Sequence, residues 1–533
     1  FIDLLKTIPE PLPPETRSRH SIPYIADAIR SIHFPKNKAE AAAAEQRFIF
    51  ENLLLLQLSA LRERSRLKQH SAPPIPLDLE LVKKFVRSLP YRLTTAQRRS
   101  LYEIAKDLEK PRPMNRLLEG DVGSGKTVVA AAAALLAVQA GYRAAFMAPT
   151  EILARQHYAT LSKVLAPFNA SIGLWVGAEK KRKDADIIVG THALIQKNIQ
   201  FENLGLVVVD EQHRFGVSQR SALARGHTRT SLESPPESAL RIPHFLSMTA
   251  TPIPRTLALT IYGDLDLSIL DEMPPTRRPV ATKIVGPGKR EETYRFIREQ
   301  VKIGRQVFVV CPRIELETWS LPARRSAGGE LGQQKLLRLD SKAVKEEYKK
   351  LSEQIFPDLR VAMLHGKMKS KEKETAMEKF RRGGTDILVS TSVIEVGVDV
   401  PNATIMLIEG AERFGLAQLH QFRGRVGRGA EQSYCFLFPT EEGIMTRRLK
   451  AVVEAKTGFE LAEQDLKIRG PGELFGTRQW GAGDLALKGL TDPKLVREVR
   501  AEALELVKKS PDLSRYQLLR NRLQEMEYTA HLE

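Results

Sequence analysis

The sequence predicts an α/β protein with two parallel-sheet domains in tandem, a helical linker region before them and a helical region after them. Three observations predict this fold class. Short, continuously apolar runs alternate with helical stretches, which is typical of parallel sheets covered by helices on both faces. A proline-rich stretch at 273–279 divides these runs into two groups. In addition, 533 residues are too many for one hydrophobic core.

The expected regions follow in chain order. Residues 1–73 begin with a proline-rich stretch and continue as a long helix at about 39–69, whose leucines recur near helical spacing and indicate packing. The first sheet domain is expected at 74–275, the second at 276–440, and a mainly helical region at 441–533.

The strands of both sheets are expected where the apolar runs occur. In the first domain these runs lie at 144–147, 187–189, 206–209 and 245–248, and in the second at 307–310, 361–364, 387–389, 405–408 and 434–438. Two polar stretches, 226–243 and 319–334, are expected to be surface insertions or disordered loops.

The charge balance favours a polyanionic partner. The chain has 82 Lys and Arg residues against 64 Asp and Glu residues, a net charge of +18. Clustered cations bind phosphate backbones well, although a basic soluble enzyme would show the same excess.

Cysteine content and hydropathy exclude other classes of protein. The two cysteines, Cys311 and Cys435, can form neither a disulfide framework nor a Cys-rich zinc site, and both are expected to be buried thiols in a reducing compartment. The longest apolar run, 128–138, is shorter than the ~20 residues that a membrane helix needs. Because the chain begins at Phe1, an N-terminal segment is expected to be missing.

Residues 120–127 read Gly-Asp-Val-Gly-Ser-Gly-Lys-Thr, the pattern of a nucleotide phosphate-binding loop. The glycines let successive N–H groups turn toward phosphate oxygens. Lys126 places a positive charge on the outer phosphates, and the Thr127 hydroxyl can ligate Mg²⁺. A strand-like run precedes the loop and an Ala-rich helical run follows it, so a helix N-terminus would face the phosphates. The alternative is a glycine-rich turn that binds nothing. The expected nucleotide contacts are Gly120, Gly123, Ser124, Gly125, Lys126 and Thr127.

A second motif, 207–213, is an apolar run that ends in Asp210 and Glu211. Ligands of parallel sheets gather at the carboxyl ends of the strands. Asp210 is expected to hold Mg²⁺, and Glu211 to orient and deprotonate the attacking water. An acidic strand end without a function is the alternative.

Near the end of the second sheet domain, Arg423, Arg425 and Arg428 alternate with Gly424 and Gly427. An arginine at a γ-phosphate stabilises the charge of the transition state, for which lysine lacks the planar fork. If Arg425 and Arg428 reach the phosphate loop, the nucleotide lies between two domains, and binding would close the cleft. A solvated basic surface is the alternative.

The motifs, in their order along the chain, resemble those of a superfamily 2 helicase of the DExH kind over about residues 74–440, with two RecA-like motor domains. The resemblance implies that Gln97 reads adenine, so that the nucleotide is ATP. It implies that Thr249 and Thr251 couple hydrolysis to movement and that Gly397 and Asp399 lie at the nucleotide cleft. The residues implied to line a nucleic-acid track are Pro149, Thr150, Thr191, His192, His365 and Thr391.

A narrower resemblance covers residues 457–479, which are similar to the translocation motif shared by RecG-type branched-DNA helicases and the transcription-repair coupling factor. It implies that 441–533 forms a translocation hairpin and C-terminal helices. Arg448, Arg469 and Gln479 would link the motor to this hairpin, with Arg478 held beside them. The stretches that favour the RecG type lie at 118–125, 147–155, 211–216 and 262–270.

The expected function is therefore that of an ATP- and Mg²⁺-dependent translocase of the RecG type, acting on branched double-stranded DNA such as stalled forks and Holliday junctions. The family's N-terminal wedge is expected to be missing, so that residues 1–73 are the linker that follows it. A single-stranded-DNA-binding protein is a further expected partner, and a monomer in the bacterial cytoplasm, associated with the nucleoid, is expected. The alternatives are a coupling factor, an RNA helicase, or a DNA-binding scaffold that does not hydrolyse ATP.

Overall fold

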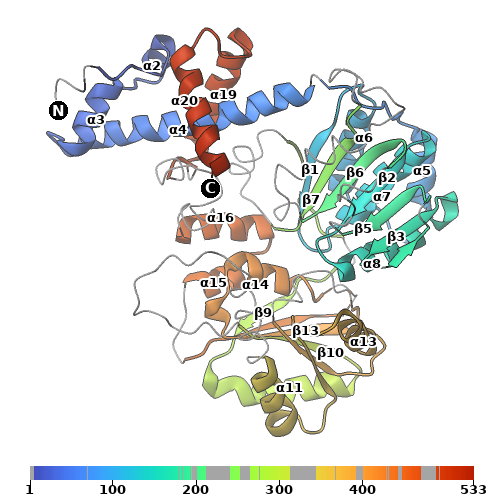
Figure 1. The fold of residues 1–533 in the computed structure, drawn as a ribbon. Coiled ribbons are helices and arrows are strands. Elements are labelled where there is room, and N and C mark those ends of the chain that lie inside the picture. The colour runs from blue at the N-terminus through green and yellow to red at the C-terminus, as the bar shows by residue number, and fades with distance from the viewer. Residues whose placement is uncertain are drawn as a thin grey trace.

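The computed structural model describes residues 5, 7–68, 70–177, 179–182, 184–191, 194, 201–211, 241–251, 265–274, 277–312, 344–366, 368–391, 400–427, 429, 431–441, 447–469, 488–490 and 492–532. Two sheet domains lie beside a helical body that contains both ends of the chain, and one long helix runs from this body to the first sheet domain (Figure 1). The predicted fold class is confirmed, since one sheet is wholly parallel, the other is parallel except at one edge, and helices cover both.

The first sheet domain contains an eight-stranded sheet in the order β4-β3-β5-β2-β6-β7-β1-β8. Every neighbouring pair is parallel except β3 and β4. The strands are β1 Asn115–Gly120, β2 Arg143–Met147, β3 Ile172–Val176, β4 Glu179–Lys181, β5 Ile187–Gly190, β6 Leu204–Asp210, β7 His244–Thr249 and β8 Asp266–Leu270. Its helices are α5 Leu79–Ser88, α6 Thr95–Leu108, α7 Lys126–Gln139 and α8 Glu151–Leu165.

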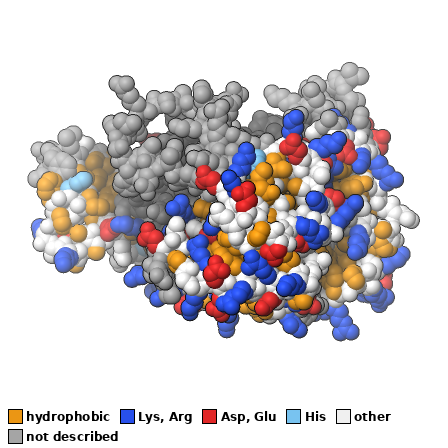
Figure 2. All heavy atoms as spheres, turned by 90° about the horizontal axis from the view of Figure 1, so that it is seen from below, with side chains coloured by type: hydrophobic (Ala, Val, Ile, Leu, Met, Phe, Trp, Pro, Cys, Tyr) orange, Lys and Arg blue, Asp and Glu red, His pale blue; other side chains and the backbone are white. Residues whose placement is uncertain are grey.

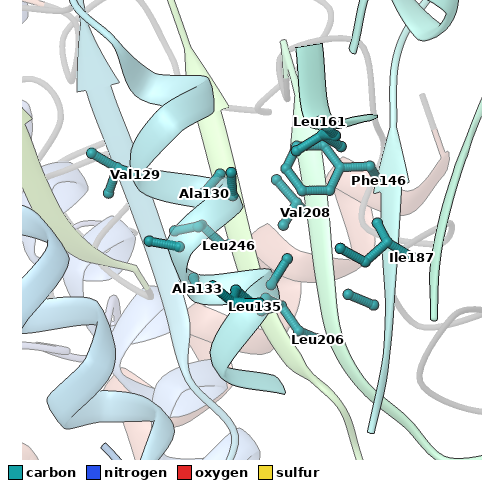
Figure 3. Close-up of a cluster of buried hydrophobic side chains, with 14 of the residues drawn as sticks. Val129, Ala130, Ala133, Leu135, Phe146, Leu161, Ile187, Leu206, Val208 and Leu246 are labelled. Atoms are coloured by element: carbon teal, nitrogen blue, oxygen red, sulfur yellow. The ribbon is translucent and has the colours of Figure 1, made fainter. Parts of the chain in front are cut away.

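The Ala-rich helix α7 packs closely on this sheet. Figure 3 shows Ala130 and Ala133 of α7 lying over Val208 and Leu246 of the central strands. Small side chains on the helix let its backbone approach the sheet, and the whole cluster is buried. This packing holds the first turn of α7 in place at the carboxyl edge of the sheet, directly after the phosphate loop.

The second sheet domain contains a six-stranded, wholly parallel sheet in the order β11-β12-β10-β13-β14-β9. Side chains of its strands alternate between two buried clusters, so helices cover both faces. The strands are β9 Ala281–Ile284, β10 Gln306–Val310, β11 Val361–Leu364, β12 Ile387–Ser390, β13 Ala403–Glu409 and β14 Tyr434–Phe438. The helices of this part of the chain are α11 Arg290–Lys302, a π-helical turn Lys350–Ile355, α13 Ser370–Arg381, α14 Leu416–Arg423, α15 Arg447–Glu454 and α16 Gly458–Arg469.

All nine apolar runs predicted as strands are strands, and four further strands were not predicted. Three of these, β4, β8 and β9, are edge strands. They are less buried than the central strands and lack the continuous apolar run by which a buried strand is recognised. The fourth, β3, is mostly buried, but its second residue is a glycine, Gly173.

The two ends of the chain share one hydrophobic core, which the sequence did not reveal. The helices are α2 Pro14–Arg19, α3 Ile25–His33, α4 Lys38–Lys68, α19 Pro493–Lys509 and α20 Gln517–Leu532. Leucines of α4, including Leu54 and Leu58, pack against Val499 and Leu523. Buried Glu502 of α19 accepts a hydrogen bond of 2.6 Å from Thr16 of α2. The predicted helix at about 39–69 is thus confirmed as α4, and its partner is the C-terminal region.

Other predictions have mixed outcomes. Both cysteines are buried, as expected. The insertion predicted at 319–334 lies outside the described residues, as does most of the one at 226–243, of which only 241–243 are described. Within the described ranges, no helix combines the length and apolar character needed to cross a membrane. The boundaries of the four predicted regions stay predictions.

Candidate functional site

The phosphate loop joins the end of β1 to the start of α7. Gly123 and Gly125 have φ angles of +83° and +90°, which L side chains rarely adopt. A Cβ at Gly123 would meet the guanidinium of Arg277, and one at Gly125 would meet the amide of Gln97. Glycine is therefore favoured at both positions by conformation, and a larger residue would also displace Arg277 or Gln97.

Two side chains, Lys126 and Arg277, donate hydrogen bonds to carbonyl groups of the loop. Lys126 Nζ donates to the carbonyls of Gly120 and Asp121, at 2.6 and 3.0 Å. Arg277 donates to the carbonyl of Val122. With these carbonyls held, the loop keeps the compact turn that lets N–H groups face a phosphate.

Gln97 has two partners in this structure. Its Oε1 accepts a hydrogen bond from the main-chain N of Thr94, and its Nε2 donates to the carbonyl of Ser124 at 2.7 Å. Gln97 therefore caps α6 and braces the phosphate loop. Its predicted role as the reader of adenine stays a prediction. One lone pair of Oε1 and one N–H of Nε2 remain for a further partner. In the same loop, Ser124 Oγ is buried without a partner among the described residues, which fits contact with a ligand oxygen.

Asp210 ends strand β6 and lies next to Lys126 in the same buried site. Its Oδ2 is 2.8 Å from Nε2 of His157 on α8. Burial alone would raise the pKa of Asp210, but the hydrogen bond and charge of His157, together with Lys126 and Arg425, lower it. Asp210 thus stays ionised, as a metal ligand must.

Glu211 is the strained residue of the site. Its φ of +56° is unusual for a residue with a side chain, and its N–H donates to the carbonyl of Met248 at 2.9 Å. Burial and the neighbouring Asp210 raise the pKa of Glu211 to about 7, against the effects of Lys126 and Arg425. Two adjacent carboxyl groups with pKa values shifted in opposite directions are typical of a divided role, one as metal ligand and one as general base.

Arg425 brings the second sheet domain into the site. It is buried, and its charge lowers the pKa of Asp210, Glu211 and Lys126 alike. These effects require a guanidinium close to all three groups. Arg425 therefore lies near these three groups, and its predicted role at the nucleotide stays a prediction. Arg428, Gly397 and Asp399 lie outside the described residues.

A chain of hydrogen bonds joins the two domains beside Glu211. Thr249 Oγ1 donates to Glu211 Oε2 at 3.4 Å and accepts from the N–H of Thr251 at 3.1 Å. Gln421 Nε2 of α14 then donates to Thr251 Oγ1 at 3.0 Å. Thr249 and Thr251 thus lie between the acid and the second domain, where the resemblance placed a coupling role for them.

Sequence reasoning missed Arg277, which lies in the linker between the domains. Besides its bond to the phosphate loop, Arg277 donates to carbonyls of the arginine-rich turn: Gly427 at 2.8 Å and Gly424 and Val426 at 3.2 Å. One guanidinium thus ties both walls of the cleft together. His157 was missed as well. Only the folded chain brings either residue to the site, and the local sequence carries no signal of it.

The predicted nucleic-acid track residues follow two pairs of adjacent strands. Thr150 N-caps α8 after β2, and Thr191 follows the neighbouring strand β5. His365 and Thr391 follow the adjacent strands β11 and β12 in the second domain. Pairing of the strands therefore brings each pair of residues together at a carboxyl edge. Pro149 directly precedes Thr150, and His192 lies outside the described residues.

An ion pair connects α8 and α13, the helices that follow two of these edges. Arg155 Nε lies 2.7 Å from Oε1 of Glu374, and the two residues come from different sheet domains. Lys and Arg side chains are mixed with Asp and Glu over the described surface seen in Figure 2. On this face, the positive net charge is therefore not gathered in one patch.

The predicted hairpin contacts are described only in part. Arg448 Nη2 donates to the carbonyl of Glu412 at 2.9 Å, which attaches α15 to the second sheet domain. Arg469 ends α16, and its side chain is outside the description, as are Arg478 and Gln479 as a whole.

Comparison with known proteins covers nearly the whole chain. Residues 94–260 match the DEAD/DEAH box helicase family, residues 289–430 the helicase conserved C-terminal domain, and residues 455–531 the C-terminal part of domain 3 of ATP-dependent DNA helicase RecG. The chain is 46% identical to ATP-dependent DNA helicase RecG of Synechocystis sp., over 96% of this chain and 60% of the relative.

Other relatives agree. The chain is 42% identical to ATP-dependent DNA helicase RecG of Aquifex aeolicus over 98% of this chain and 65% of the relative, and 42% identical to that of Streptococcus pneumoniae over 94% and 72%. A structure of RecG bound to a three-way DNA junction is 38% identical, with a TM-score of 0.74, covering 94% of this chain and 62% of the other. The chain thus spans about three fifths of the length of several relatives.

Proposed function

This chain belongs to the RecG family of ATP-dependent DNA helicases, and on this premise we propose that it hydrolyses ATP and uses the energy to move along branched double-stranded DNA. One observation carries the proposal. Lys126 and Asp210 of the first sheet domain are buried, as is Arg425 of the second, and the partly buried Glu211 lies beside them. A site that needs both domains for its charges is suited to converting hydrolysis into domain movement.

Each residue of the cleft has a chemical role in this proposal. The phosphate loop and Lys126 bind the phosphates of ATP, with Gln97 beside the adenine. Glu211 accepts the proton of the attacking water, and Arg425 and Arg428 stabilise the charge of the transition state. The hydroxyl of Thr127 and the carboxylate of Asp210 are oxygen donors suited to Mg²⁺, which would neutralise phosphate charge when bound. Gly397 and Asp399, which lie outside the described residues, would complete the cleft.

The load on this motor is branched double-stranded DNA, such as a stalled fork or a Holliday junction. The support is the match of residues 455–531 to domain 3 of RecG and the similarity to the junction-bound structure. The track residues at the strand ends would contact the DNA, and the segment 457–479, with Arg469, Arg478 and Gln479, would transmit force to it. We further propose a monomer in the bacterial cytoplasm, associated with the nucleoid and with a single-stranded-DNA-binding protein.

ATP hydrolysis measured with and without forked DNA tests the proposal. We expect forked DNA to stimulate turnover, and Lys126→Ala and Glu211→Gln each to lower it by about 10³ or more, since Lys126 acts on the reacting phosphate and Glu211 on the attacking water. Thermal denaturation of both variants provides the control for folding. Unchanged turnover in either variant would contradict the assignment, and DNA binding without any hydrolysis by the wild type would indicate a scaffold.

A further inference from the structure

The phosphate loop also makes contacts through the side chain of Asp121. This residue is buried, so its two carboxylate oxygens depend on donors from the protein. Oδ1 accepts a hydrogen bond of 2.9 Å from Nε2 of His420 on α14, and Oδ2 accepts one of 3.1 Å from the main-chain N–H of Gly458 at the start of α16. Burial alone would raise the pKa of Asp121, but these donors and Lys126 lower it to about 2. Asp121 is therefore a permanent anion between two helices of later parts of the chain.

The neighbours of His420 determine which of its nitrogens carries the proton. Nδ1 of His420 lies 3.0 Å from Nη2 of Arg423. A guanidinium can only donate, so Nδ1 accepts and Nε2 donates to Asp121. Arg423 also donates to the carbonyls of Val452 and Ala455, at 2.7 and 3.1 Å, where α15 ends. The contact with Asp121 thus extends through α14 to the turn between α15 and α16.

The main chain of Asp121 responds to a different group. Its carbonyl accepts a hydrogen bond from Lys126 Nζ, the charge expected to meet the outer phosphates of ATP. A γ-phosphate would draw Nζ away from this carbonyl. Nucleotide binding would then remove a main-chain hydrogen bond of Asp121, the residue whose side chain accepts hydrogen bonds from His420 and Gly458. A close approach of Gly424 to Val122 keeps the same surfaces together.

We propose that Asp121 is a positioning residue that couples the nucleotide state of the phosphate loop directly to α16, and through it to the segment 457–479. The inference rests on the proposed function and adds a second route of coupling, separate from closure of the cleft by Arg425. It follows that hydrolysis and movement can be uncoupled by changes at Asp121 or His420.

Three variants of the full chain test this route. His420→Ala removes the donor to Oδ1, whereas His420→Gln keeps an N–H donor in a side chain of similar reach. Asp121→Asn keeps the shape but replaces one acceptor oxygen with an NH₂ group, so only one of the two bonds can form. The measurements are the KM for ATP, DNA-stimulated kcat, and the number of ATP molecules hydrolysed for each third strand displaced from a DNA triplex, which reports movement along duplex DNA.

We expect His420→Ala and Asp121→Asn to raise the ATP consumed per displaced strand by about tenfold, because each breaks a hydrogen bond to a buried charge, while the KM for ATP changes less than about threefold. His420→Gln should stay near the wild-type ratio. Hydrogen exchange of the peptide that contains Gly458 should quicken in Asp121→Asn before any nucleotide is added.

An unchanged ratio in His420→Ala, or exchange at Gly458 unaffected by Asp121→Asn, would overturn the inference. Equal losses of hydrolysis and displacement in the Ala and Gln variants would also overturn it, since that result indicates a structural role alone. If the wild type neither hydrolyses ATP with DNA nor displaces the third strand, the proposed function itself fails.

Discussion

The two sheet domains have similar architectures but contribute opposite chemistry to the cleft. The first supplies carboxylates: buried Asp210 ends a central strand, and partly buried Glu211 follows it. The second supplies donors from α14 and the turn after it: His420, Gln421 and Arg425. Because anions on one side meet donors on the other, neither domain has a complete site. The cleft is therefore an interface between two domains as well as a pocket. Opening it moves the donors of the second domain away from the carboxylates of the first.

Removing the cation of the second domain tests the comparison most severely. Arg425→Ala should lower kcat for ATP by about 10³, since an arginine at the γ-phosphate is worth that much or more in related reactions. Arg425→Lys is the matched control: it keeps the charge without the planar fork and should recover only part of the loss. A kcat of Arg425→Ala within about threefold of the wild type would show that the first domain is sufficient for hydrolysis.

The raised pKa of Glu211 predicts how ATP hydrolysis depends on pH. As a base, Glu211 must be ionised, so kcat/KM for ATP should rise with pH through about 7 and then level off. Bound Mg²⁺ would lower this pKa in the complex. The raised pKa therefore applies to the free enzyme, which is the state that kcat/KM reports. A profile flat from pH 5.5 to 8.5 would contradict this role.

The pH dependence of the protein's stability tests the ionisation of Glu211 independently of catalysis. The folded protein holds the proton of Glu211 more tightly than the unfolded chain, whose pKa is near the ordinary 4.5. Ionisation therefore costs stability as pH rises from 4.5 to about 7, and Glu211→Gln escapes this cost. The denaturant midpoint of the variant should exceed that of the wild type at pH 8, and the gain should shrink toward pH 4.5. A gain that is independent of pH would mean that Glu211 has no raised pKa.

The hydrogen-bond chain between the domains should have a smaller effect. Gln421→Ala removes one neutral hydrogen bond to Thr251, which is worth about 1 kcal/mol, so DNA-stimulated kcat should fall about fivefold with little change in the KM for ATP. Gln421→Glu is the control, since it keeps the length of the side chain but cannot donate when ionised. Wild-type kcat in both variants would place the coupling elsewhere.

The ion pair between Arg155 and Glu374 should matter least. Both side chains are partly exposed, and such pairs contribute at most ~1 kcal/mol. A double-mutant cycle of Arg155→Ala and Glu374→Ala, followed by thermal denaturation, should show a small coupling energy that disappears in high salt. A coupling energy well above 1 kcal/mol would make this contact a second interface of the same rank as the cleft.

Several features of the fold and the site could be predicted because they are local. A buried parallel strand needs a continuous apolar run, so the central strands could be recognised, whereas the edge strands β4, β8 and β9 could not. Gly123, Gly125 and Lys126 must lie close together in sequence to make a phosphate loop, so their pattern is visible in the chain itself.

The sequence by itself determined which groups do the chemistry: the loop lysine, the paired acids and the arginine-rich turn. Only the tertiary structure decided what holds them. His157 beside Asp210, Arg277 across the cleft, His420 and Gly458 on Asp121, and the shared core of the two chain ends all join residues far apart in sequence. Their geometry depends on packing and burial, which give a side chain a partner that no local pattern specifies.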